Sequence, residues 1–292
     1  MRQGDGCIEG IVDFIWSAPY MESTNEDHAR QPERRAVKSE SYPWYDSVWL
    51  QKYDRATAII RRVRPNALAR FVDAFRVFHT SSDFEVKLLE RPFDDATLEA
   101  IRATVKSLRP TDLELHEARS FGRFVVHDHP FLTELQQRAV PLVSGVVGEP
   151  VEANYNFLSL YTKMGVCPVH MDAPEAKWTL DLCIDQSAPW PIHISPVQPW
   201  PNAEPKAWHG EDWEGNLKRV QRFNSYILQP GQALVFSGSS QWHYRDAMPD
   251  ASGQRFCTLL FFHFVPSGTR QLVRPENWAN LFGIPDLSEV AG

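Results

Sequence analysis

The apolar residues of this chain fall into many short runs separated by glycine and proline, a pattern that predicts short strands. The clearest run, residues 233–236, follows the turn signal Pro230–Gly231. A longer, aromatic-rich run extends from residue 255 to residue 265. Many short strands of this kind are typical of a sandwich or barrel. The other predicted strands are residues 122–126, 153–163, 178–184, 191–195 and 224–228.

A second pattern, with apolar residues at helical spacing, lies in the first half of the chain. Residues 55–77 alternate apolar and basic positions and are split by Pro65, which predicts one or two helices. Residues 93–108 form the clearest helix, because they open with an aspartate cap signal and Pro110 follows their end. A further helix is predicted over residues 131–139, begun by Pro130 and ended by Pro141.

These patterns together predict a mainly β protein with flanking helices, of the α+β class. The polar, charge-dense run at residues 21–35 lacks apolar periodicity and is expected to be a mobile loop or tail. We expect four segments, namely an N-terminal extension (1–50), supporting helices and strands (51–150), a β core (151–266) with an insert (196–223), and a C-terminal tail (267–292).

Composition narrows the classes of protein that remain. The 30 Lys and Arg residues against 37 Asp and Glu give a net charge of −7, which argues against a nucleic-acid partner. The four cysteines form no C-x-x-C pair, so neither a zinc ribbon nor a disulfide scaffold is indicated. No apolar run approaches the ~20 residues that a membrane helix needs. We therefore expect a cytoplasmic protein with no membrane partner.

Two residues able to bind a metal, His170 and Asp172, stand two positions apart. Side chains two positions apart on an extended segment share a face, so they can hold one ion between them. A third ligand would complete the two-histidine, one-carboxylate site that holds one face of Fe(II). His243, shortly after the predicted strand 233–236, is the best candidate. The alternative is a set of unconnected structural histidines. His127 and His129 are assigned a capping and turn role, because they precede Pro130 at the start of a predicted helix.

A single cation, Arg255, stands at the mouth of the apolar run that ends at residue 265. Burying an arginine is costly unless an anion meets it. In a barrel that holds a metal, a dicarboxylate cosubstrate would be that anion, because a guanidinium matches a carboxylate with two parallel hydrogen bonds. Arg245 is the next candidate for this role.

Taken with these residues, the chain resembles the Fe(II)/2-oxoglutarate-dependent oxygenases, and within them the prolyl-hydroxylase-like branch. The resemblance covers roughly residues 120 to 265. Cys257 stands where many relatives carry a serine, and Cys183 where some place a second tyrosine. The matching features, in order, are Tyr161 and Gly165, His170-x-Asp172, Pro230–Gly231, His243 and Gly253-x-Arg255.

The resemblance implies a double-stranded β-helix core of the jelly-roll or cupin-like kind. It implies Fe(II) held by His170, Asp172 and His243, with 2-oxoglutarate anchored by Arg255 and hydrogen-bonded by Tyr161. The implied reaction is hydroxylation of an unactivated C–H bond of a small molecule or an amino-acid- or peptide-like substrate, with consumption of O2 and release of succinate and CO2.

Two other functions remain open at this point. The first is a cupin-like metal dioxygenase or isomerase that works without 2-oxoglutarate, which Gly253-x-Arg255 argues against. The second is a non-catalytic β-barrel binding module in which the histidines are structural. Oxygen consumption with and without 2-oxoglutarate separates the first, and iron content after anaerobic purification separates the second.

The candidate substrate contacts lie on one strand and in one irregular stretch. His193 lies on the predicted strand 191–195 and contacts substrate if it points inward, whereas a partly exposed strand histidine is the ordinary alternative. The stretch 196–215, rich in tryptophan and proline, is predicted to be either a substrate lid or a packed Ω-loop. Its tryptophans are Trp200, Trp208 and Trp213.

Overall fold

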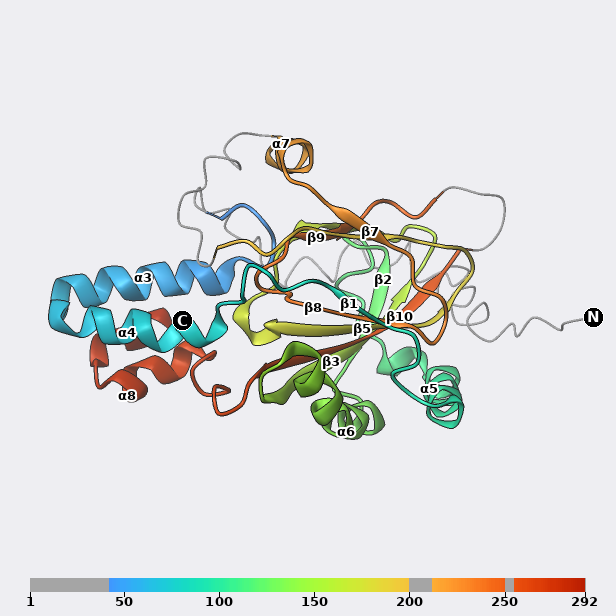
Figure 1. Ribbon diagram of the computed structural model, residues 1–292, viewed down its shortest axis with the longest axis horizontal. Coiled ribbons are helices and arrows are strands. Elements are labelled where there is room, and N and C mark those ends of the chain that lie inside the picture. The colour runs from blue at the N-terminus through green and yellow to red at the C-terminus, as the bar shows by residue number, and fades with distance from the viewer. Residues whose placement is uncertain (1–41, 200–211, 250–254, 292) are drawn as a thin grey trace, which may run out of the picture.

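The strands form two antiparallel sheets, one lying over the other (Figure 1). The larger has six strands in the order β1-β8-β5-β10-β3-β2, and the smaller has four in the order β4-β9-β6-β7. The strands are β1 (Lys87–Leu89), β2 (Arg123–His127), β3 (Val151–Tyr161), β4 (Cys167–His170), β5 (Trp178–Gln186), β6 (Ile192–Ile194), β7 (Asn224–Tyr226), β8 (Ala233–Phe236), β9 (His243–Arg245) and β10 (Cys257–Pro266).

This computed structural model describes residues 42–199, 212–249 and 255–291. The predicted mobile run at 21–35 and two of the candidate tryptophans, Trp200 and Trp208, lie outside these ranges. Antiparallel sheets with flanking helices confirm the predicted α+β class. The double-stranded β-helix connectivity and the four-segment division stay predictions. No helix of the described residues is long and apolar enough to cross a membrane.

The central strand β10 shows why the aromatic-rich run folds as it does. Side chains alternate between the two faces of a strand. Phe262 and Phe264 point to the helix-covered face and are fully buried there, whereas Phe261 and His263 line a cavity between the two sheets. One strand thus supplies core on one side and a functional surface on the other.

Two helices cover the outer face of the larger sheet (Figure 1). The predicted helix at 93–108 is confirmed as α5 (Asp95–Ser107), whose N-cap Asp94 accepts a hydrogen bond from the Thr97 amide at 2.8 Å. The helix predicted to end at Pro141 is wrong in length, because α6 runs from Pro130 to Val147 with Pro141 inside it. Val143 beyond the proline is fully buried against the sheet, and this burial outweighs the lost backbone hydrogen bond.

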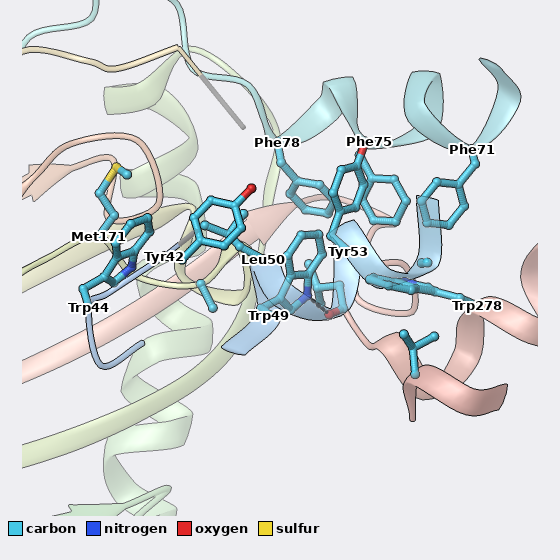
Figure 2. Close-up of a cluster of buried hydrophobic side chains, with 14 of the residues drawn as sticks. Tyr42, Trp44, Trp49, Leu50, Tyr53, Phe71, Phe75, Phe78, Met171 and Trp278 are labelled. Carbon is cyan, nitrogen blue, oxygen red and sulfur yellow. Dashed lines mark hydrogen bonds between the residues drawn. The ribbon is translucent and has the colours of Figure 1, made fainter. Parts of the chain in front are cut away.

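A bundle of helices lies at one end of the sheets and joins both halves of the sequence. The prediction for 55–77 is confirmed as two helices divided at Pro65, α3 (Val48–Val63) and α4 (Leu68–Ala74). They pack with α8 (Trp278–Phe282) from the predicted C-terminal tail (Figure 2). Trp278 is fully buried there, with ring centroids 5.4 Å from Trp49 and 5.6 Å from Phe71.

The predicted insert contains a helix that was not predicted, α7 (Trp213–Val220). Asp212 caps it by accepting from the Gly215 amide at 3.2 Å. Trp213 is buried, and its ring centroid lies 6.4 Å from that of Trp242. The third candidate tryptophan is therefore a packed residue, and whether the stretch is a lid or an Ω-loop stays a prediction. Strand β1, three residues long and mostly exposed, was also not predicted.

Candidate metal centre

Strand register brings the two histidines of the predicted triad together. His170 ends β4, His243 begins β9, and these two residues are directly opposite each other in the antiparallel pair. Their ring centroids are 4.1 Å apart. Residues facing each other across a ladder share a face, so two histidines more than seventy positions apart in the sequence become neighbours.

Asp172 completes the cluster from just beyond the end of β4. The spacing predicted that Asp172 shares an extended segment with His170, but Asp172 lies beyond the strand and loop contacts fix its position. Its amide donates to the Gly238 carbonyl at 2.9 Å. Its Oδ1 lies 3.3 Å from His170 Nε2 and 3.5 Å from His243 Nε2. The three donor atoms all lie within 4.8 Å of one another.

Backbone carbonyls set the tautomer of both imidazoles. His170 Nδ1 donates to the Pro168 carbonyl at 2.9 Å, and His243 Nδ1 donates to the Gln241 carbonyl at 3.0 Å. Because each Nδ1 donates to a carbonyl, Nε2 is the nitrogen of each ring that faces Asp172 and would bind a metal. Two imidazole nitrogens and one carboxylate oxygen, nearly buried, fit the donor set of a facial Fe(II) triad.

The three ligands also shift one another's pKa values. Burial opposes the charge on Asp172, but His243 and His170 outweigh it and hold the pKa of Asp172 well below its usual value. Burial likewise opposes the charge on His170, yet Cys167 and Asp172 raise the pKa of His170 well above its usual value. The pKa of His243 is lowered by burial and by His170. Without metal, the cluster therefore holds a proton on His170 that a cation would displace.

The cluster lies in the wall of a cavity of about 220 Å³ between the two sheets. Tyr161, the predicted cosubstrate contact, lines the same cavity. Its hydroxyl accepts a hydrogen bond from Arg123 Nη1 at 2.8 Å. Arg123 also forms an ion pair with Glu117. The end of the cavity around Tyr161 and Arg123 is therefore rich in hydrogen-bond donors.

Two of the remaining predicted residues do not line this cavity. Arg255 lies just before β10, and no acceptor among the described residues meets its buried Nε. His193 on β6 is half-buried, with Nδ1 2.8 Å from the Ser225 hydroxyl and its ring stacked on Tyr244 at 4.5 Å. His193 is thus a partly exposed strand histidine in this structure, and its contact with substrate stays a prediction.

Arg245 lines the cavity in place of Arg255. Its guanidinium donates to Asp181 Oδ2 at 2.8 Å and to the Trp190 carbonyl at 2.6 Å. Both ends of this ion pair are almost fully buried. Arg245 stands two positions after His243 on β9, so strand alternation places it on the same side, a signal that the sequence already contained.

Three further residues line the cavity but were not predicted from the sequence, namely Tyr45, Asp46 and His263. Tyr45 and Asp46 reach the cavity from the segment before α3, and the Tyr45 ring lies 4.5 Å from that of His170. Nothing in the sequence connects them to a site more than a hundred residues away. His263 alternates with buried phenylalanines on β10, and this alternation could have identified it.

No protein-family model and no curated protein matches this sequence. Solved structures with a similar course of the chain include the non-heme alpha ketoglutarate dependent epimerase SnoN from nogalamycin biosynthesis, with 13% identity, 72% of this chain and 90% of that chain covered, and a TM-score of 0.47. HygX from Streptomyces hygroscopicus with nickel, 2-oxoglutarate and hygromycin B bound has 13% identity, coverage of 68% and 86%, and a TM-score of 0.49. An oxidoreductase of the 2OG-Fe(II) oxygenase family from Burkholderia pseudomallei has 12% identity, coverage of 68% and 89%, and a TM-score of 0.44.

Proposed function

We propose that this protein is a non-haem Fe(II)- and 2-oxoglutarate-dependent oxygenase. The observation that carries the proposal is the cluster of His170, Asp172 and His243, whose donor atoms converge in a cavity with both imidazoles in the tautomer of a metal ligand. This donor set binds one face of Fe(II) and leaves the other face open. The double-stranded β-helix and the prolyl-hydroxylase-like branch go with this proposal as predictions.

When bound, Fe(II) and 2-oxoglutarate supply the oxidising chemistry, in which one oxygen atom of O2 ends in succinate, the other is transferred to substrate, and CO2 is released. The chain contributes binding, orientation and exclusion of water. The Pro168 and Gln241 carbonyls hold the two histidines in place. Aromatic side chains such as Phe157 and Phe261 line the same cavity as the two histidines and limit the access of water.

For the cosubstrate we propose the donor-rich end of the cavity around Tyr161. A dicarboxylate needs donors and positive charge, and Tyr161 and Arg123 meet there. Arg255 stays the predicted anchor for the far carboxylate, with Arg245 as the alternative because its guanidinium lines the cavity. The predicted outcome is hydroxylation of an unactivated C–H bond in a small or peptide-like molecule, in the cytoplasm.

One observation favours a rival, a metal-dependent dioxygenase or isomerase that works without 2-oxoglutarate. Both arginines of the cavity already have a carboxylate partner, Arg123 with Glu117 and Arg245 with Asp181. Oxygen consumption by the Fe(II)-loaded protein, measured with and without 2-oxoglutarate, separates the two functions. Consumption that needs 2-oxoglutarate and yields succinate supports the oxygenase, and consumption that is independent of it supports the rival.

Binding of 2-oxoglutarate to the metal-loaded protein, measured by calorimetry under nitrogen, tests the anchor. We expect Arg255→Ala to weaken binding about ten- to hundredfold, since a hydrogen bond to a charged group contributes ~1.5–3 kcal/mol. The exposed Arg119→Ala is the matched control and should bind as the wild type does. Unchanged binding by Arg255→Ala would move the anchor to Arg245.

A further inference from the structure

One wall of the cavity is a row of side chains that crosses three neighbouring strands. Tyr155 on β3, His263 on β10 and Thr179 on β5 are directly opposite one another in the two ladders. Residues in register share a face, and all three line the cavity. The rings of Tyr155 and His263 lie 4.3 Å apart and stack, which fixes the imidazole in the wall.

The hydrogen bonds of His263 define which of its nitrogens is free. The Thr179 hydroxyl donates to Asp172 Oδ2 at 3.3 Å. The Thr179 hydroxyl oxygen also lies 3.1 Å from His263 Nδ1. A hydroxyl has one proton, so Thr179 accepts from Nδ1–H and the proton of the neutral ring is on Nδ1. His263 Nε2 is therefore an acceptor, and it is buried with no partner among the described residues.

Burial of His263 keeps this acceptor available. It lowers the pKa of His263 to about 4, so the ring is neutral near physiological pH and Nε2 keeps its lone pair. A buried acceptor without a donor is costly, and native structures rarely leave one without a role or a bound partner. A hydrogen-bond donor on a molecule in the cavity would satisfy this acceptor.

Asp46 is a second acceptor in the same cavity. Its Oδ2 accepts from the Ala173 amide at 3.0 Å, and no described lysine or arginine pairs with its carboxylate. Burial and the nearby Asp172 raise the pKa of Asp46 to about 7, against the opposing effect of His170. The arginines of the cavity are instead paired with Glu117 and Asp181.

The two kinds of polar group lie toward different ends of the cavity. Tyr155, beside His263, and Tyr161, beside Arg123, are six residues apart on β3, which corresponds to about 20 Å of extended strand. Phe157 and Phe261 lie between these rows and stack at 4.8 Å. The cavity thus has a donor-rich end and an acceptor-rich end with an aromatic surface between them.

We propose that the substrate is a ring-shaped small molecule bearing hydroxyl or amino groups, whose hydrogens are received by His263 Nε2 and Asp46 while its ring rests on the aromatic wall. The substrate class rests on the proposed function, in which the cosubstrate takes the donor-rich end. The preference for ligands with hydrogen-bond donors depends only on His263 and Asp46, so it can be measured separately from the reaction.

Ligand-observed NMR with three probes of one ring size tests this preference on the full chain loaded with Co(II) and 2-oxoglutarate. The probes are 1,4-cyclohexanediol and trans-4-aminocyclohexanol, which carry donors, and 1,4-cyclohexanedione, which carries acceptors only. We expect the two donor probes to bind about three- to tenfold more tightly than the dione, the range that one hydrogen bond supplies. Equal binding of the three probes, or no binding of any, would overturn the proposal.

Variants assign the preference to named atoms. His263→Phe keeps the stacked ring but removes the acceptor and should abolish the preference, whereas His263→Gln keeps an acceptor and should retain it. Asp46→Asn should reduce binding of the aminocyclohexanol more than that of the diol, since a carboxylate attracts an ammonium group most. An unchanged preference in both His263→Phe and Asp46→Asn would contradict the proposal even if the wild type discriminates.

The same samples separate this inference from the proposed function. If the wild type binds neither metal nor 2-oxoglutarate, the proposed function fails, and the probes are then compared on the metal-free protein. A donor preference that persists there and depends on His263 supports the acceptor wall. If the metal-free protein shows no donor preference, the proposed role of His263 and Asp46 is overturned as well.

Discussion

Gly238 lies against the carboxylate of Asp172, and the contact leaves no room for a side chain. A Cβ at this position would overlap Asp172 Oδ2 and lie 2.6 Å from the Ala176 carbonyl, which belongs to the backbone. We therefore expect Gly238→Ala to displace the carboxylate and weaken metal binding at least tenfold, the effect typical of losing support around a ligand. Metal titration checks this.

The matched control for Gly238 is Gly145 in α6, where an added Cβ meets nothing within 4 Å. Gly145→Ala should leave metal binding unchanged and stabilise the fold by about 0.5–1 kcal/mol through helix propensity. Equal metal affinity in the two variants would show that the position of Asp172 does not depend on Gly238.

Arg245 of the cavity wall forms an almost fully buried ion pair with Asp181. Asp181→Ala leaves the guanidinium without its carboxylate partner, so we expect a loss of about 3–5 kcal/mol in the free energy of unfolding. Replacing both residues, as Asp181→Leu with Arg245→Met, should cost less than the single change. Denaturant unfolding measures both, and a larger loss in the double variant would contradict a pair held mainly by mutual compensation.

Metal binding should depend on pH through His170. Its pKa is raised in the metal-free protein by Cys167 and Asp172 against the effect of burial, so the metal competes with a proton there. The sign follows directly, because raising the pH removes the proton and strengthens metal binding. Below the raised pKa, we expect affinity to rise up to about tenfold per pH unit, with one proton released per ion bound. Calorimetry in buffers of different ionisation enthalpy counts the protons, and binding independent of pH between about pH 6 and about pH 8 contradicts this account.

At the level of single residues, the sequence indicated the metal cluster because His170, Asp172 and His243 have the ligand types and lie beside predicted strands. It did not indicate Tyr45 or Asp46, because their place in the cavity depends on how distant segments pack, and the alternation on β10 that marks His263 was not used. Arg255 illustrates the converse. Its position before an apolar strand was predicted correctly, but its side chain does not line the cavity, and its role as the anchor stays a prediction.

At the level of elements, punctuation by glycine, proline and cap residues predicted α5, the division of α3 from α4, and most strands. The failures have identifiable causes. Pro141 was treated as the end of a helix, but the apolar face of α6 continues to Val143 and its burial keeps the helix intact. The three-residue strand β1 is too short and too exposed to give an alternating pattern.

Helix α8 is held to α3 and α4 chiefly by aromatic contacts (Figure 2). Trp278 is fully buried among Trp49, Tyr53, Phe71 and Phe75. We expect Trp278→Ala to cost about 3–5 kcal/mol of unfolding free energy, the range for truncating a buried aromatic side chain. Leu281→Ala on the same helix is the control, because Leu281 is 43% exposed. Similar losses in the two variants would show that α8 is not anchored by this cluster.

At the scale of the whole molecule, the two sheets enclose a cavity to which strands from both contribute. The sequence predicted the class of fold from the number and spacing of its short strands. The order of the strands could not be predicted from the sequence, because it depends on long-range contacts that the local pattern does not encode. The helices at the outer face and at one end support this cavity without lining it.

The central claim is that His170, Asp172 and His243 together hold one metal ion. The most direct test is Fe(II) stoichiometry after anaerobic loading of the wild type, of His243→Ala, and of His193→Ala as a histidine control outside the cavity, with circular dichroism to verify folding. We predict one ion per chain for the wild type and for His193→Ala, and a loss of most bound iron in a folded His243→Ala variant. A folded His243→Ala variant that binds one Fe(II) with wild-type affinity would contradict the account.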